Sequence, residues 1–306
     1  AQKIGIGSIS MENLFLDSRV RENYLNTSIK TSLFKVSDSM QFQNVDLNAN
    51  TNNQEINCGL TFSDKKQQIQ TSGIINFKSI LVGGILQGGF ENSELNILGN
   101  RITINNDNII SYNGNKISIL NFLLQKDKGK IQVDGTLSKE KEDKLTIDFD
   151  NFDISMFNPI LKNANIALAG QINNTITFRS ILGSPFFTSN LVVDSLMLNN
   201  NELGKTFLNI NNTATSGEYF VNVKMLHKTK DIAQYSPLTA TGFLYPESKT
   251  QNLNLAISMQ NLSLKVIENY ISSFASDCQG TLNTRNLTVK GTFNQPNIHG
   301  NLVFNN

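Results

Sequence analysis

Side chains that could carry out catalysis or bind a metal are few and widely spaced in this sequence. Its 306 residues include two histidines, His227 and His299, and two cysteines, Cys58 and Cys278. Neither histidine has a second ligand at the spacing of a metal site, and the cysteines form no C-x-x-C pair. We predict no metal site and no cofactor. The cysteines are interpreted as isolated small residues in sheets, with a disulfide between them as the open alternative.

An acidic cluster, D-F-D-N-F-D, places Asp148 and Asp150 on one strand face and Asp153 beyond a change of register. Such carboxylates could bind Ca²⁺ or act as a catalytic pair. A solvated strand face explains them equally well, and the parallel stretch A-I-S-M-Q-N, residues 256–261, contains no acid. The sequence also lacks a nucleophile elbow, a phosphate-binding loop and a zinc-protease motif. We therefore expect a protein that is not an enzyme.

Composition and charge exclude several classes of partner. The chain has 26 basic and 25 acidic residues, and its net charge of +1 provides no field that would attract nucleic acid. Asparagine makes up about one residue in seven. The longest apolar run, residues 80–90, contains four glycines and is too short to cross a bilayer. The first residues do not resemble a signal peptide, so we expect a mature or excised piece of a longer protein.

Apolar and polar residues alternate in short runs over much of the chain, which is the period-two pattern of strands with one buried face. Leu145, Ile147 and Phe149 point one way, whereas the residues between them point the other way. The dipeptide Asn113-Gly114 predicts a hairpin turn. The same parity places His299 on the polar face of the last strand.

The closing stretch of the chain repeats an earlier one, and a fixed offset is typical of stacked repeat architectures. Pro185 corresponds to Pro296, an offset of 111 residues. Gly135 and Gly242 are 107 residues apart, and Gly170 and Gly280 are 110 apart. Four further pairs share the 111-residue offset: Ile176 with Leu287, Phe178 with Val289, Leu182 with Phe293, and Leu191 with Leu302.

Both copies change parity partway through, from Phe149 to Phe152 and from Met259 to Leu262. A shared change of register predicts a shared bulge or corner. Each copy then has a short stretch with helical spacing, residues 155–164 and 266–276. In the first copy Pro159 should limit any helix to about one turn on either side.

These patterns predict an all-β fold, an elongated, solenoid-like repeat sheet with short helical caps. Roughly 20 strands spaced by ~4.8 Å would advance on the order of 100 Å. We expect three segments: residues 1–90 as a less similar region of the same sheet, 91–200 as one repeat unit and 201–306 as a second. The apolar stripe predicted to line the concave face comprises Leu145, Ile147, Phe149, Ile176, Phe178, Leu182, Leu191, Val193, Leu253, Leu255, Ile257, Leu287, Val289, Phe293, Leu302 and Phe304.

The stretches D-G-T-L-S at 134–138, K-L-T-I-D-F-D-N-F-D-I-S at 144–155, I-L-K-N-A-N-I-A-L-A-G-Q-I-N at 160–173 and the run 183–211, with their echo at 280–304, carry a family resemblance. Residues of about 90–306 resemble the TamB family of the AsmA-like superfamily, in its Asn- and Lys-rich Bacteroidota form. The shared motif is loose and consists of spaced Gly-x-Ile/Leu, Gly-x-x-x-x-Pro and Gly/Ser-Asn-Leu elements in a fixed order. The chain departs from the family because it has neither the N-terminal anchor nor a recognisable partner-binding end.

The resemblance implies a β-taco, a U-shaped sheet whose apolar groove shields phospholipid acyl chains between the inner and outer membranes. It further implies a periplasmic location, a longer parent protein anchored in the inner membrane, and a barrel partner of the BamA/TamA type. The expected function is therefore lipid transfer in outer-membrane biogenesis.

Two other functions remain open at this stage. An assembly factor could use an exposed sheet edge to receive strands of an outer-membrane protein. A surface adhesin could bind glycans, but it should present aromatic platforms on the outer face, and the sequence contains no tryptophan.

Overall fold

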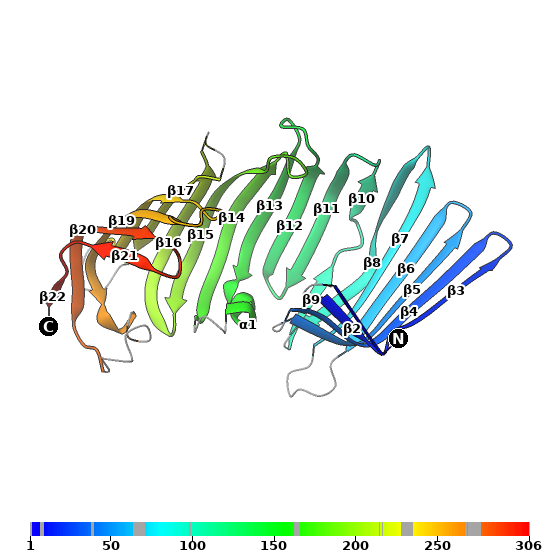
Figure 1. Cartoon of the computed structure of the whole chain (residues 1–306), viewed down its shortest axis with the longest axis horizontal. Helices are drawn as coiled ribbons and strands as arrows, with labels where there is room; N and C mark the ends of the chain where they lie inside the picture. Colours follow the sequence, from blue (N-terminus) through cyan, green and yellow to red (C-terminus); the bar gives the residue numbers. More distant parts are fainter. Residues whose placement is uncertain are drawn as a thin grey trace. The chain divides into compact units, whose positions relative to one another are not determined.

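The computed structural model describes residues 2–6, 9–37, 40–63, 71–97, 99–161, 166–213, 215, 217–227, 235–266, 268 and 277–305. This part of the chain contains 22 strands and three short helical segments. Every strand pairing described for it is antiparallel, so the predicted all-β repeat sheet is confirmed. Figure 1 shows most strands lying beside their neighbours in chain order within each part.

The chain divides into two compact units. Unit 1 comprises residues 1–147 and 179–184, and unit 2 comprises residues 148–178 and 185–306. The strand β13, Lys144–Asp153, begins in unit 1 and ends in unit 2.

Unit 1 is built from hairpins whose long strands pair over most of their length. β4 pairs with β5, β5 with β6, β6 with β7 and β7 with β8. β9 and β10 both lie between β8 and β11. Gly114, at φ 90°, forms the predicted turn between β10 and β11. The strands are β1 Lys3–Ile6, β2 Ile9–Glu12, β3 Phe15–Arg21, β4 Tyr24–Ser37, β5 Met40–Asn52, β6 Glu55–Ser63, β7 Ser72–Val82, β8 Ile85–Ile97, β9 Asn100–Ile104, β10 Ile109–Tyr112, β11 Ile117–Lys126 and β12 Gly129–Leu137.

Unit 2 continues the same plan. β15 pairs with β16, and each following strand up to β20 pairs with the one before it. β20 then pairs with both β21 and β22. The elements are η1 Ile154–Phe157, α1 Asn158–Leu161, β14 Leu168–Arg179, β15 Phe186–Leu198, β16 Asn201–Asn212, β17 Tyr219–Leu226, β18 Leu238–Leu244, β19 Leu253–Ser263, η3 Leu264–Val266, β20 Thr281–Gly291, β21 Pro296–His299 and β22 Val303–Asn305.

The predicted shared bulge is present in both copies of the repeat. Asn151 and Asn261, 110 residues apart, have φ angles of 48° and 51° within β13 and β19. The Asn151 N–H donates to Asn173 Oδ1 at 2.8 Å, and the Asn261 N–H donates to Asn283 Oδ1 at 2.9 Å. Asparagine tolerates this left-handed backbone better than most residues. The pairing of β19 with β20 changes register at the same place, between Met259 and Leu262.

The helical segments follow the bulges directly. η1 and α1 succeed β13. The described part of α1, Asn158–Leu161, contains Pro159, and residues 162–164 of the predicted helical stretch lie outside the described residues. η3 succeeds β19, but most of the predicted helical stretch 266–276 lies outside the described residues. None of the described helices is long and apolar enough to cross a membrane.

Candidate functional site

One face of the unit 2 sheet is apolar from strand to strand. Cross-strand pairing sets Leu208 opposite Leu191 and Val223, and it continues through Ala240 to Ile257. A second row runs beside the first and joins Leu255 to Val289 and Ile298. We call these side chains the unit 2 apolar face: Leu191, Val193, Leu208, Ile210, Val221, Val223, Leu253, Leu255, Ile257, Leu287, Val289 and Ile298.

The burial of this face changes at the bulge. Beyond the bulge Leu262 and Leu282, each 3% exposed, pack with Leu203 and with Val266 of η3. Before the bulge Leu255, Ile257 and Val289 are only half-buried. The helical segment therefore covers one margin of the apolar face. Away from that margin the burial is mixed: Leu191, Val193, Val221 and Leu287 are buried, Ile298 is exposed, and the other seven residues of the face are half-buried.

The first copy has a similar covered margin. Phe152 of β13 is 4% exposed and lies 6.2 Å, between ring centroids, from Phe157 of η1. Phe149, before the bulge, is half-buried and lies 6.3 Å from Phe152. The repeat in the sequence is thus also a repeat in how its apolar side chains are covered.

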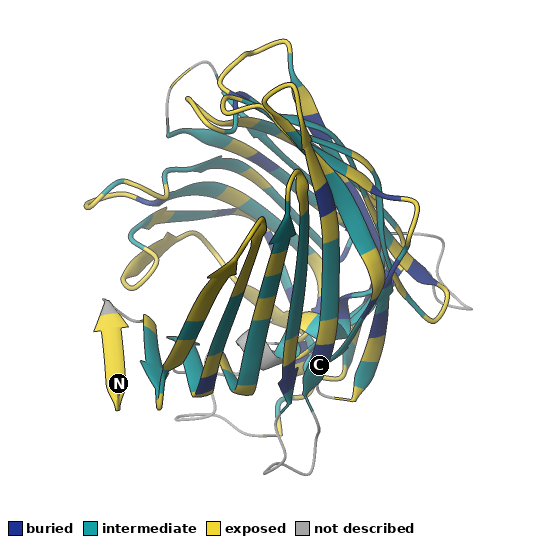
Figure 2. Cartoon of the chain, turned by 90° about the vertical axis from the view of Figure 1, so that its right-hand side faces the viewer, coloured by how far each residue is buried: buried dark blue, intermediate teal, exposed yellow. Residues whose placement is uncertain are grey.

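Unit 1 carries an apolar face of its own, with aromatic rings at its centre. Phe77 lies opposite Cys58 and Phe90 in the pairing, and the ring centroids of Phe77 and Phe90 are 5.2 Å apart. Phe122 continues the row at 5.7 Å from Phe90. A parallel row sets Leu60 between Leu47 and Ile75. Figure 2 shows the resulting alternation of exposed and partly buried residues along the strands.

The opposite face of each unit carries ion pairs, and in unit 2 it also carries Phe220 and Phe243, whose ring centroids are 5.6 Å apart. Lys30 Nζ lies 2.7 Å from Asp46 Oδ2, Arg101 contacts Glu94 at 2.6 Å, and Lys205 contacts Asp194 at 2.9 Å. The hydrogen bond from Arg101 lowers the pKa of the Glu94 carboxyl. These pairs are solvent-exposed, so each contributes little to stability.

The structure disperses the predicted stripe residues over three environments. Leu145, Leu191, Val193 and Leu287 are buried. Leu182, Phe293 and Leu302 lie outside the strands and are 41% to 54% exposed, and Phe304 in β22 is 63% exposed. The remaining eight are half-buried strand residues: Ile147, Phe149, Ile176, Phe178, Leu253, Leu255, Ile257 and Val289.

Several residues of the two faces were not among those predicted. β16 and β17 contribute Leu208, Ile210, Val221 and Val223, and unit 1 contributes its aromatic row. For the four residues of β16 and β17, the same alternation of apolar and polar residues is present in T-F-L-N-I-N-N and Y-F-V-N-V-K-M-L, and it could have identified them. Comparison of the two repeat copies did not identify these residues, because their strands lie outside the segments that match between the copies.

The residues considered for chemistry are separated or already paired. His299 pairs with Thr288, on the side opposite Val289 and Ile298, as predicted. His227 makes an edge-to-face contact with Tyr235, with ring centroids 5.8 Å apart. Asp148 accepts a hydrogen bond from Thr175, and Asp150 accepts one from Asn151. Both cysteines are free, and the described residues contain no group of three metal-binding side chains.

Neither a protein-family model nor a curated protein matches this sequence, and no solved structure matches the chain either.

Proposed function

We propose that this chain is a non-enzymatic module that binds the acyl chains of lipids on the apolar faces of its two units. The observation that supports the proposal most is the two-sided sheet: half-buried aliphatic and aromatic side chains line one face, whereas asparagines and ion pairs occupy the other. An acyl chain needs no specific partner atom, which suits a face without convergent polar groups.

The extent of exposed surface supports an open face. The accessible surface of the chain is 18933 Å². Two compact globular domains sharing its 306 residues equally would expose only about 15,000 Å² together. Each acyl methylene that leaves water on such a face contributes about 0.8 kcal/mol. Lipid covering the apolar faces would therefore stabilise the folded chain.

The fuller form of the proposal follows the TamB resemblance. The apolar faces would shield phospholipid chains in transit between the inner and outer membranes, as part of a longer periplasmic protein held by a membrane anchor. Head groups would remain outside the apolar region. No single residue along that region would be specifically required, because any apolar side chain can contact an acyl chain.

A matched pair of substitutions on β19 tests the binding of lipid. Leu255→Asp places a charge on the unit 2 apolar face, and Ala256→Asp places the same charge one residue away on the opposite face, where Ala256 is exposed. We expect phospholipid to co-purify with the unsubstituted chain and with Ala256→Asp, and to fall at least tenfold in Leu255→Asp. Mass spectrometry of extracted lipid measures the effect, and circular dichroism checks that both variants fold.

A second candidate function, strand capture during outer-membrane protein assembly, is favoured by β3. This strand pairs only with β4 in the described chain. Its Leu16 and Val20, 63% and 74% exposed, extend the unit 1 apolar face to that edge. An unpaired edge can accept a strand from another chain. If strand capture is the function, no lipid will co-purify and Leu255→Asp will behave like Ala256→Asp.

A further inference from the structure

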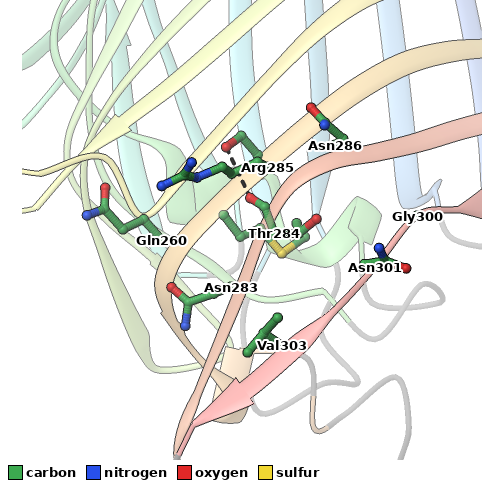
Figure 3. Close-up of a pocket in the computed structure, with 10 residues that line it drawn as sticks. Gln260, Asn283, Thr284, Arg285, Asn286, Gly300, Asn301 and Val303 are labelled. Atoms are coloured by element: carbon green, nitrogen blue, oxygen red, sulfur yellow. Dashed lines mark hydrogen bonds between the residues drawn. The ribbon is translucent and has the colours of Figure 1, made fainter.

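A cavity of about 640 Å³, lined by both polar and apolar groups, lies against β19 and β20 of unit 2. Figure 3 shows its lining, which comes from these strands, from Gly300 and Asn301, and from Val303 of β22. The lining contains one cation, Arg285, and no carboxylate. Its amide side chains belong to Gln260, Asn283, Asn286 and Asn301.

The cavity lies where the β20 ladder is interrupted. β20 pairs with β22 over residues 281–283 and with β21 over residues 288–291, so residues 284–287 pair with neither strand. The lining includes Met259, which shares the apolar side of the sheet with Leu282, and Ser258, which points the other way. Residues from both sides of the sheet therefore border one cavity.

Several polar groups of the lining have no partner in the described chain. Asn283 Nδ2 and Thr284 Oγ1 are buried and make no hydrogen bond, and Thr284 is 6% exposed as a whole. Arg285 forms neither an ion pair nor a side-chain hydrogen bond with any described residue. A buried donor without a partner destabilises the fold, so a ligand that accepts its hydrogen bond would relieve that cost.

The first copy of the repeat shows what the equivalent amide binds. Asn173 corresponds to Asn283 at the 110-residue offset, and its Nδ2 donates to Asp194 Oδ2 at 3.0 Å. The same offset sets Asp148 at the position of Ser258 and Thr175 at the position of Arg285. The first copy therefore supplies its own carboxylates here. In the second copy Ser258 stands where the first copy has an acid, Arg285 adds a cation, and the Asn283 Nδ2 has no hydrogen-bond partner in the described chain.

We propose that this cavity binds a small oxyanion of the phosphate class. Arg285 supplies the counter-charge, and the amides of Asn283, Asn286 and Asn301 supply hydrogen-bond donors. Because the cavity also borders Met259 on the apolar side, the phosphate of a lipid whose acyl chain lies on the unit 2 apolar face is the favoured source. That assignment of the source rests on the proposed function, whereas the oxyanion site does not.

Titration of the full chain with inorganic phosphate by calorimetry tests the site. We expect saturable binding that Arg285→Gln weakens by about ten- to a hundredfold, because hydrogen bonds to charged groups are the strong ones. Lys290→Gln is the matched control: it removes the same charge from the same strand, outside the cavity lining. Absence of saturable binding, or equal weakening by both substitutions, overturns the site.

A second titration identifies the source of the phosphate. Dihexanoyl phosphatidylglycerol, used below its micellar concentration, should bind more tightly than inorganic phosphate and should lose affinity in Arg285→Gln. Equal affinities for the two ligands would keep the oxyanion site and reject the lipid as its source. Because inorganic phosphate has no acyl chain, the first titration detects the oxyanion site even if the apolar faces bind no lipid.

Discussion

At the residue scale, asparagine does more than solvate this sheet. Asn151 and Asn261 occupy the left-handed backbone of the two bulges, and the Asn173 and Asn283 side chains accept the N–H groups that those bulges displace. Asn108 acts similarly in unit 1: its Oδ1 accepts the Phe90 N–H, and its Nδ2 donates to the Phe90 carbonyl. At these three places a side-chain amide makes a hydrogen bond to the backbone where the regular ladder is interrupted.

Parity alone was sufficient to place individual side chains on the correct face where a strand is regular. It separated Ile298 from His299 and Leu255 from Ala256, because successive side chains in a strand alternate. It could not place Leu182, Phe293 or Leu302, which lie in connections. Glycine and asparagine are so frequent here that they do not distinguish a turn from a bulge.

One ion pair at the loop between β12 and β13 should make a contribution to stability that depends on pH. Lys116 Nζ lies 2.6 Å from Asp143 Oδ2, and the hydrogen bonds from Lys116 and then Ser138 lower the pKa of Asp143 below its ordinary value of 3.8. A depressed carboxyl pKa contributes stability that is present above the ordinary value and lost as pH falls through the folded value. Asp143→Asn should therefore lower the urea midpoint at pH 7 and have a smaller effect as pH falls below 3.8.

Urea unfolding of the two proteins at pH 7 and at pH 3 measures this difference. Asp127→Asn is a suitable control, because Asp127 lies in the hairpin turn between β11 and β12 and takes no part in this ion pair. An equal effect of Asp143→Asn at the two pH values would contradict the account.

At the scale of the elements, the repeat recurs as backbone geometry. Gly135 and Gly242 have φ angles of 124° and 149°. A Cβ at either glycine would lie 2.1 Å from a carbonyl oxygen of the next strand, that of Lys144 or of Asn254. The sequence predicted the correspondence of these glycines and of the bulges that follow them. It did not predict that β9 and β10 share one position between β8 and β11, because strand pairing depends on contacts between distant residues.

Substitution of Gly242 tests this close approach of backbones. Gly242→Ala should destabilise unit 2 by about 1–3 kcal/mol or more, because neither the Asn254 carbonyl nor the positive φ can accommodate a side chain. Gly59→Ala, in β6, is the control: its Cβ would meet only Asn76 Oδ1 at 3.5 Å, so little change is expected. Chemical unfolding of both variants gives the comparison. Similar losses at both glycines would contradict the account.

At the scale of the whole molecule, two units each present an apolar and a polar face, and the chain provides few residues suited to chemistry. The alternation and the repeat were enough to predict this all-β organisation. The burial of individual residues on the apolar face was harder to predict, because it depends on where η1 and η3 cover the sheet. Residues of the same type, such as Leu255 and Leu262, consequently differ in burial although they share one strand.

The most direct test of acyl-chain binding is a photocrosslinking map along β19. A phospholipid with a diazirine in its acyl chain is bound to the purified chain and irradiated, and the labelled residues are identified by mass spectrometry. Binding on the unit 2 apolar face predicts labels with a period of two, on Leu253, Leu255 and Ile257 but not on Asn254, Ala256 or Ser258. Equal labelling of both sets, or no labelling of either, would contradict the proposal that this face binds lipid.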